Sequence, residues 1–155
     1  MAKRLSMILD NSFRFLMIVQ LYTLANVLVF LLNCFVKLLR KVLRNHWSDE
    51  LINLYGRIQG QDPEEQLLIA EQWLKHRTNN PELLLALGRL SLRNELWGKA
   101  REYFETSLKL RRNRETLAEL SRLNAHMGEE EASIKLLMQG LETDHGLPDL
   151  PMPRA

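Results

Sequence analysis

The sequence is poor in cysteine, because Cys34 is the only one among 155 residues. A single thiol excludes an internal disulfide framework and any zinc site built from several cysteines. Cys34 lies in an apolar stretch, where a cysteine usually serves as a small buried hydrophobe. We therefore expect neither a disulfide bond nor a metal held by several thiolates.

An excess of positive charge is also missing. The chain has 21 Lys and Arg residues against 19 Asp and Glu residues, which gives a formal net charge of +2. Domains that bind nucleic acid over a broad surface carry a clear excess of basic residues. We therefore expect no nucleic-acid partner.

The motifs of common enzyme chemistry are absent as well. The sequence contains no glycine-rich phosphate loop, no HExxH pair and no nucleophile elbow. Its histidines are scattered, without a second ligand at metal-binding spacing: His46, His76, His126 and His145. We expect no enzymatic activity, no metal and no cofactor. Haem ligation by His126 stays an alternative, although an exposed or capping histidine is far more common at the end of a helix.

What the sequence does contain is one long uncharged run, from Phe15 to Val36. As a helix it would extend roughly 33 Å, enough to cross the hydrocarbon core of a bilayer. The rest of the chain is too small to cover such a helix on all sides. Residues 1–36 are therefore expected to form an apolar N-terminal helix that anchors the protein in a membrane.

Two alternatives to a membrane anchor follow from the same run. One is a soluble helical adaptor that buries this helix by self-association, which would make the protein a homo-oligomer. The other is a cleaved signal peptide. That reading fits poorly, because the run is longer than a usual signal core and no small-residue cleavage site follows it.

Basic residues flank the uncharged run on both sides. Four follow it (Lys37, Arg40, Lys41 and Arg44) and three precede it (Lys3, Arg4 and Arg14). Because cytoplasmic flanks carry more Lys and Arg, this small difference favours a cytoplasmic C-terminal part. Residues 37–47 are predicted to form a basic amphipathic connector, lying near anionic lipid or packed on the helices that follow.

Polar residues also occur within the run. At 100° per residue, Tyr22, Thr23, Asn26 and Asn33 share about one third of the helix surface. Inside lipid, such a stripe favours pairing with a partner helix, each interhelical hydrogen bond contributing roughly 0.6–2 kcal/mol. The alternative is that these residues only weaken insertion.

The clearest repeat pattern lies between Pro81 and Arg112. Apolar residues recur at helical spacing on both sides of a predicted tight turn, which indicates two antiparallel helices. Small residues at Gly88 and Ala100 allow these helices to approach closely, and Phe104 follows at an aromatic position. This order is typical of a tetratricopeptide (TPR) unit.

We expect three such units within residues 48–142, near 49–80, 81–113 and 114–142. The predicted fold class is all-α, an array of TPR-like helical hairpins (an α-solenoid) behind the long apolar helix. The residues predicted to pack the repeats are Leu87, Gly88, Trp97, Ala100, Phe104, Leu120, Ser121 and Ser133.

Local signals indicate where these helices begin and end. Ser48, Asp62 and Asn80 are good N-caps, and a proline follows each of the last two at the first helical position. The first unit is degenerate, because Tyr55-Gly56 and Ala70 match the repeat at a spacing about two residues short. Residues 143–155 are expected to form a Pro-rich flexible tail.

In TPR arrays the first helices of the units line a concave surface. The corresponding positions here include Arg89, Arg93 and Arg122, and guanidinium groups suit acidic peptides, carboxylates or propionates. The alternative is a solvated charged face on which these arginines pair with Glu82, Glu115 and Glu119. The predicted partner-binding groove consists of Arg89, Arg93, Arg122, Leu85, Leu92 and His126.

Two segments carry a more specific signal. One is KLLRKVLRNHWSDELINLYGRIQG, which begins at Lys37, and the other is LLLALGRLSLRNELWGKAREYFETSLKLR, which begins at Leu83. They resemble the C-terminal TPR region of the HemY family, and the resemblance covers roughly residues 37–142. Members of this family are inner-membrane proteins of proteobacteria associated with haem biosynthesis.

The resemblance implies a bacterial inner-membrane protein whose TPR part lies in the cytoplasm. It implies a scaffold for protein partners, among them late enzymes of the haem pathway, and no oxidoreductase activity. Family members carry two N-terminal spans and many helices ahead of the matched region. The sequence is therefore expected to represent a truncated or rearranged member, and a non-functional member is the alternative to a working scaffold.

Overall fold

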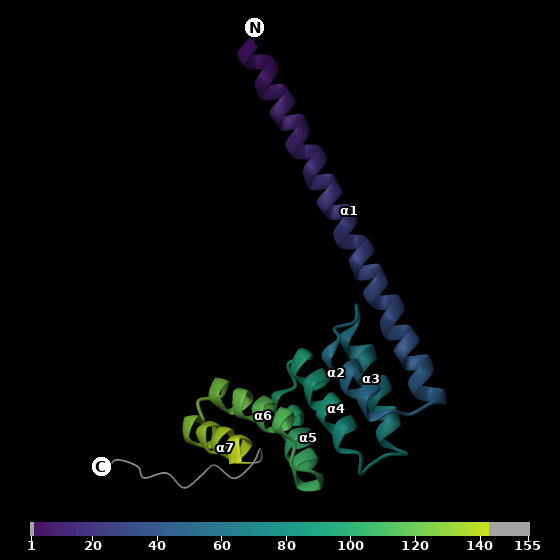
Figure 1. Cartoon of the computed structure of the whole chain (residues 1–155), viewed down its shortest axis with the longest axis vertical. Helices are drawn as coiled ribbons and strands as arrows, with labels where there is room; N and C mark the ends of the chain where they lie inside the picture. The colour runs from purple at the N-terminus through teal and green to yellow at the C-terminus, as the bar shows by residue number, and fades with distance from the viewer. Residues whose placement is uncertain (1, 143–155) are drawn as a thin grey trace, which may run out of the picture.

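The computed structural model describes residues 2–142, and every regular element within them is an α-helix (Figure 1). Side chains are described for Arg14 and for residues 16–141. The predicted tail, residues 143–155, lies outside the described residues. The helices are α1 (Ala2–Asn45), α2 (Asp49–Arg57), α3 (Pro63–Leu74), α4 (Pro81–Arg93), α5 (Trp97–Leu110), α6 (Arg114–His126) and α7 (Glu130–Glu142). The predicted all-α array of helical hairpins behind one long apolar helix is confirmed.

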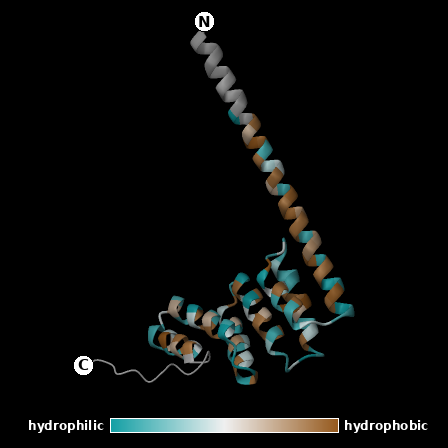
Figure 2. Ribbon diagram, in the orientation of Figure 1, coloured by the Kyte–Doolittle hydropathy of each residue, from teal (hydrophilic) through white to brown (hydrophobic). Residues whose placement is uncertain are grey.

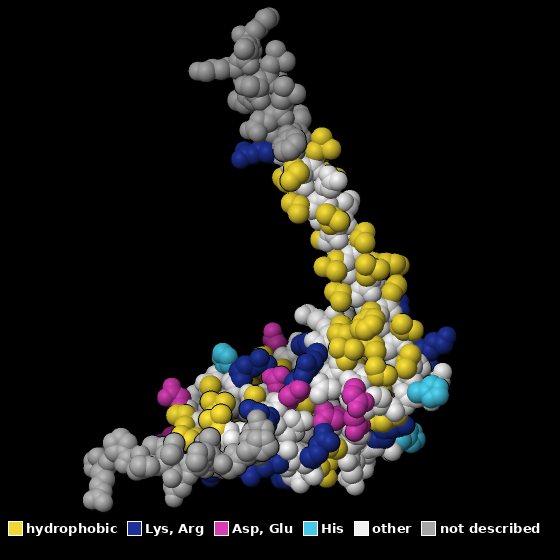
Figure 3. Space-filling model, in the orientation of Figure 1, with side chains coloured by type: hydrophobic (Ala, Val, Ile, Leu, Met, Phe, Trp, Pro, Cys, Tyr) yellow, Lys and Arg dark blue, Asp and Glu magenta, His cyan; other side chains and the backbone are white. Residues whose placement is uncertain are grey.

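α1 projects from the array that the other helices form (Figure 1). The described residues of its projecting part are mostly apolar, as the hydropathy colouring of Figure 2 and the side chains in Figure 3 show. Its segment Leu16–Asn45 contains a window with a mean hydropathy of 1.9, of which 0% is buried within the structure. By length and composition α1 can cross a membrane, and a signal sequence near an N-terminus shares these properties.

The helix starts that the sequence indicates are confirmed. The Ser48 hydroxyl accepts a hydrogen bond from the backbone N–H of Leu51 at 3.4 Å. Asp62 accepts from Glu65 at 2.9 Å, and Asn80 accepts from Leu83 at 2.7 Å. Each cap satisfies an N–H that has no partner inside its helix, so the polar ends of α2, α3 and α4 are fixed by local sequence.

The first core cluster joins the end of α1 to the first hairpin and α4. Val36, Leu39 and Leu43 of α1 are at most 5% exposed. They pack with Ile52, Tyr55, Leu67, Ala70, Leu83, Ala86, Leu87 and Leu90. The last turns of α1 therefore cover the first hairpin. α1 continues without a break to Asn45, so the helical part of the predicted connector is an extension of the apolar helix.

Polar contacts fix α1 against the hairpin at two levels. The Nε of Arg40 donates to the Tyr55 hydroxyl at 3.1 Å, and its Nη1 lies 3.0 Å from a carboxylate oxygen of Glu65. The second contact is made by Asn33, about two turns before Arg40 on α1. Its Oδ1 accepts a hydrogen bond from the backbone N–H of Gln61 at 3.1 Å, and its Nδ2 donates to the Gln61 side chain. Two separated contacts hold both the position and the direction of α1.

The second hairpin, α4–α5, is held by close helix contact. A Cβ atom added at Gly88 would lie 2.3 Å from Cε1 of Phe104, so only glycine allows the ring to lie against α4. Ala100 and Phe104 are fully buried. They form the second core cluster with Leu85, Leu120 and Leu123. α4 and α5 therefore approach closely where Gly88 faces Phe104, and Leu87 is buried in the first cluster.

Trp97 was predicted to pack between the repeats, and the structure contradicts this prediction. Its side chain is 47% exposed and belongs to neither core cluster. The reason is its place at the first residue of α5, ahead of the turns that face α4. A large aromatic residue at the correct helical spacing is therefore outside the core, because spacing alone does not fix where the contact between two helices begins.

The third hairpin, α6–α7, replaces the small apolar pair with two serines. Ser121 and Ser133 occupy the positions of Gly88 and Ala100 in this unit, and their hydroxyl oxygens lie 2.8 Å apart. The Ser121 hydroxyl also lies 3.0 Å from the Ser133 carbonyl. Both side chains and Leu120 are buried. All three residues of this unit that were predicted to pack the repeats are thus buried, and a buried hydrogen bond links the two helices.

Candidate functional site

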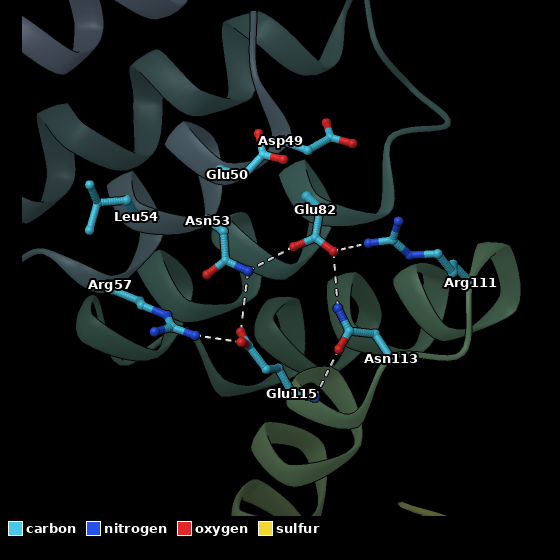
Figure 4. Close-up of a pocket in the computed structure, with 9 residues that line it drawn as sticks. All are labelled: Asp49, Glu50, Asn53, Leu54, Arg57, Glu82, Arg111, Asn113 and Glu115. Carbon is cyan, nitrogen blue, oxygen red and sulfur yellow. Dashed lines mark hydrogen bonds and ion pairs between the residues drawn. The ribbon is translucent and has the colours of Figure 1, made fainter. Parts of the chain in front are cut away.

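The side chains of α2, α4 and α6, the first helices of the three hairpins, line two adjoining cavities, and we call this surface the inner face. One cavity, of about 530 Å³, lies at the N-terminal ends of these helices (Figure 4). Its lining consists of Asp49, Glu50, Asn53, Leu54, Arg57, Glu82, Arg111, Asn113 and Glu115. The other, of about 380 Å³, is lined by Arg57, Arg89, Leu92, Arg93, Glu119 and Arg122.

Arg89 is the centre of the hydrogen-bond network that joins the three helices. Its Nε donates to Glu119 at 2.9 Å, and its Nη2 donates to Glu115 at 3.0 Å. Its Nη1 donates to the side-chain oxygen of Asn53 on α2 at 3.0 Å. The Arg89 side chain is only 10% exposed. This guanidinium therefore serves the array itself and has little left to offer a ligand.

Glu82 holds the acidic end of the inner face together (Figure 4). Its carboxylate accepts hydrogen bonds from Asn53 at 2.8 Å and from Asn113 at 3.0 Å, and it forms an ion pair with Arg111. Because these partners come from α2, from the loop after α5 and from the cap of α6, Glu82 links three segments. The first cavity contains four carboxylates and two arginines, so its charge is acidic.

Glu115 has the most strongly shifted carboxyl on this surface. Burial alone would raise its pKa, but hydrogen bonds from Arg57, Arg89 and Asn53 outweigh burial and lower the pKa from 4.5 to about 2. Glu115 is therefore ionised throughout the physiological pH range, and it balances two of the arginines that face it. A carboxylate of this kind positions its neighbours and is a poor proton acceptor at neutral pH.

Arg93 is bound differently from Arg89. Its Nη1 donates to the Ile58 carbonyl at 2.9 Å, and its Nη2 donates to the Arg57 carbonyl, so it caps the C-terminal end of α2. Burial lowers the pKa of the Arg93 guanidinium below its usual value, and the nearby charge of Arg89 lowers it further. Among the described residues no carboxylate forms an ion pair with Arg93. Its hydrogen bonds go to carbonyl dipoles, and the charge of Glu119 acts on it without a direct contact.

Arg122 is the most accessible cation of the second cavity. Its side chain is 64% exposed and, within the part of the chain that the structure describes, pairs only with Glu119, which Arg89 also contacts. This cavity has four arginines against one glutamate, so its charge is basic. The inner face therefore has two oppositely charged ends, with Arg57 between them.

The structure brings four of the six predicted groove residues together, since Arg89, Leu92, Arg93 and Arg122 line one cavity. Leu85 is a correction. It is fully buried in the second core cluster, because its side of α4 faces α5 and α6. His126 is exposed at the end of α6 and does not line either cavity. The alternative prediction was that these arginines pair with glutamates on a charged face. Arg89 pairs in this way with two glutamates, whereas the mostly exposed Arg122 does so only in part.

Two residues of α2 were missed by the sequence analysis, namely Asn53 and Arg57. The first unit matches the repeat only in part, but it does contain a signal. If Tyr55-Gly56 is aligned with Leu87-Gly88, then Arg57 falls at the position of Arg89. The glycine register alone would have placed Arg57 on the inner face, whereas it aligns Asn53 with the buried Leu85.

The residues of the inner face offer hydrogen-bond donors, acceptors and charge. Within the described residues, no group of three or more His, Cys, Asp or Glu side chains is arranged to hold a metal ion. No protein-family model matches the chain, and no curated protein matches it either. The arrangement of these side chains is therefore the basis for an inference about function.

Proposed function

We propose that this protein is a membrane-tethered interaction scaffold of the TPR type, which binds protein partners on its inner face. One observation carries the proposal: α1 is a single helix whose exposed apolar part continues directly into the core of the hairpin array. Val36, Leu39 and Leu43 are buried in that core, whereas the 18-residue apolar window is 0% buried. Hydrocarbon chains of a lipid bilayer are the environment that suits such a window.

The tether positions the array close to the membrane surface. Asn33 contacts the loop before α3, and it lies only four residues before Lys37, the first charge after the uncharged run. This distance is about 6 Å along a helix, similar to the depth of the headgroup layer. The array is therefore held against the membrane, where it meets other membrane-associated proteins.

The charges of the inner face indicate the kind of partner. A segment with carboxylates would meet Arg57, Arg93 and Arg122, and a cation on the same segment would meet the acidic cavity. Opposite charges across an interface select partners and speed up their encounter. Arg122 is the best first contact because its side chain is 64% exposed.

The HemY resemblance of residues 37–142 supplies the proposed pathway. By analogy, the partners are late enzymes of haem biosynthesis, the membrane is a bacterial inner membrane, and the hairpin array is cytoplasmic. Affinity isolation of the full chain from such membranes should enrich these enzymes over the Arg122→Glu variant. Equal recovery with both chains would remove the haem pathway from the proposal.

The membrane tether is tested by alkaline carbonate extraction of the full chain. A chain that lacks residues 1–32 is the matched comparison, because it keeps Asn33 and the buried side chains of α1. We expect the full chain to stay with the membranes. We expect the shortened chain to be soluble, with a helical circular dichroism signal reduced only by the residues of α1 that were removed. Extraction of the full chain by carbonate would overturn the tether.

The inner face is tested with a fluorescent polyglutamate peptide as the probe. Arg122→Glu should weaken its binding by about tenfold, which corresponds to about 1.4 kcal/mol. Arg89 is unsuitable for this test, because its replacement would break the network between α4 and α6. Arg112→Glu is the control, since Arg112 is exposed and lies outside both cavities. Equal effects of the two substitutions would contradict binding at the inner face.

A further inference from the structure

One stripe of residues runs along α1 through both the buried and the exposed part of the helix and turns gradually around it, so that Val36 lies about 80° from Asn26. Residues of this stripe recur at alternating intervals of three and four, the spacing by which paired helices contact each other. We call this stripe the seam, and it consists of Val19, Tyr22, Asn26, Val29, Asn33, Val36, Arg40 and Leu43.

The C-terminal half of the seam is covered by the chain's own array. Val36 and Leu43 are at most 2% exposed, and Arg40 is held by Tyr55 and Glu65. Asn33 marks the end of this cover, because its side chain bonds to Gln61 in the loop before α3. Beyond Asn33, no described element of the chain reaches the seam.

The N-terminal half of the seam is uncovered. Val19, Tyr22 and Val29 are 45%, 69% and 46% exposed. Asn26 is exposed too, and its side chain makes no hydrogen bond to the described residues. Thr23, a neighbouring polar residue, donates to the Gln20 carbonyl at 2.9 Å. Asn26 is thus a polar group of this region that the helix itself does not satisfy.

The depth of Asn26 makes this unmet hydrogen-bonding capacity costly. Asn26 lies about 18 Å from Arg14 and about 16 Å from Lys37 along the helix. These two charges bound the uncharged run, so Asn26 falls at its middle, where the short amide cannot reach either interface. In hydrocarbon, an amide without a hydrogen-bond partner is strongly disfavoured.

We propose that the occupant of this uncovered half is the same helix of a second copy of the chain, paired through Asn26. The proposal rests on the membrane span of the proposed function. An asparagine amide both donates and accepts, so two Asn26 side chains on a two-fold axis satisfy each other. A single asparagine at such a seam position also fixes the register of a two-stranded pair.

The covered half of the seam limits how the two helices run. From Asn33 onwards the array occupies the face of α1 that the partner helix would need. The helices therefore cross near Asn26 and diverge towards the arrays. Each chain of the dimer then keeps its own array with its own inner face. Two docking surfaces would therefore lie near each other at the membrane.

Energy transfer between labelled full-length chains in phosphatidylcholine vesicles tests the pairing. Asn26→Leu should lower the association constant by about tenfold or more, as expected for the loss of interhelical hydrogen bonds. Gln20→Leu is the matched control: it removes the same amide, but Gln20 faces about 120° away from Asn26. Because both substitutions make the helix more apolar, a difference between them cannot reflect poorer insertion.

Disulfide crosslinking tests the orientation. In a Cys34→Ala background, Tyr22→Cys should crosslink on oxidation, and Asn26→Leu should abolish the crosslink. The natural Cys34 should crosslink poorly, since it is turned about 80° from Asn26 in the direction opposite to the seam and lies where the helices diverge. If the chains resist carbonate extraction from the vesicles but show no energy transfer, the pairing is overturned and the membrane span is not. Chains that carbonate removes would overturn the membrane span as well.

Discussion

The first two hairpins contain the same local motif but use it differently. In α4–α5, Gly88 allows Phe104 of the same hairpin to lie against the helix. In α2–α3, an added Cβ at Gly56 would lie 2.6 Å from Cα of Ala86, which belongs to α4. Here α2 and α3 pack more extensively on α4 than on each other. A glycine therefore permits close approach, but it does not determine which helix approaches.

Other groups hold the first hairpin together. Nε2 of Gln66 donates to the carbonyls of Tyr55 and Ile58, both at 3.0 Å, and its Oε1 accepts from the Gly60 N–H at 2.9 Å. The end of α1 then covers the hairpin from outside through Val36, Leu39 and Leu43. The second hairpin is thus self-sufficient in close contacts, and the first depends on a buried amide and on α1.

The largest expected effect comes from removing the cover that α1 provides. Leu43→Ala should lower the free energy of unfolding by about 2–5 kcal/mol, because Leu43 is 1% exposed in the first core cluster. Leu38→Ala on the same helix should have little effect, since Leu38 is 55% exposed. Urea unfolding of the full chain in detergent micelles measures both. Similar losses for the two variants would show that α1 is not part of the core.

The next effect concerns the close contact of the second hairpin. Gly88→Ala should destabilise the array by about 3 kcal/mol, because the new methyl group would overlap the buried Phe104 ring. Gly98→Ala is the control, since a Cβ there meets nothing within 4 Å and alanine is the better helix former by up to about 1 kcal/mol. The two substitutions should shift thermal unfolding in opposite directions. A neutral Gly88→Ala would remove the contrast between the hairpins.

A smaller effect is expected at the amide that joins α2 to α3. Gln66→Leu should cost about 1–2 kcal/mol, because the buried carbonyls of Tyr55 and Ile58 lose their donors. Gln72→Leu, at an exposed position of α3, is the control. Hydrogen exchange should become faster around Gly60 in the first variant and stay unchanged in α5. Faster exchange throughout the array would contradict a local role for Gln66.

The smallest effect is a pH dependence of the inner face. Folding lowers the pKa of Glu115 to about 2, so its contribution to stability is present above pH 4.5 and is lost as the pH falls towards about 2. Glu115→Gln should make stability less dependent on pH in this window. Glu105→Gln, at an exposed position of α5, should keep the slope. Denaturant titrations between pH 5 and pH 2 compare them, and an identical slope in both variants would contradict the shift.

The local features of this fold were predictable because local physics determines them. The caps at Ser48, Asp62 and Asn80 need only a side chain and a nearby N–H, and both are visible in the sequence. The Gly88–Phe104 contact was predictable because repeat spacing fixes which turns of two adjoining helices meet. The apolar length of α1 was equally direct.

The features that sequence reasoning missed depend on distant parts of the chain. Leu85 and Trp97 were misplaced because burial depends on which side of a helix its neighbours cover. For Arg89 the sequence left open a ligand-facing role and pairing with Glu115 and Glu119. The structure has the pairing, and it adds a hydrogen bond to Asn53, 36 positions away in sequence. No local pattern reports such a network. Packing of residues 37–47 on the helices that follow was one of two readings that the sequence left open, and contacts across hairpins decide between them.

The central claim is that the apolar part of α1 and the hairpin array form one rigid unit, and hydrogen exchange of the full chain in lipid vesicles tests it most directly. The account predicts slow exchange without interruption from Leu28 to Asn45, first through lipid and then through the array. A fast-exchanging break between Leu32 and Lys37 would contradict it, because such a break would mean that the anchor and the array are joined by a flexible hinge.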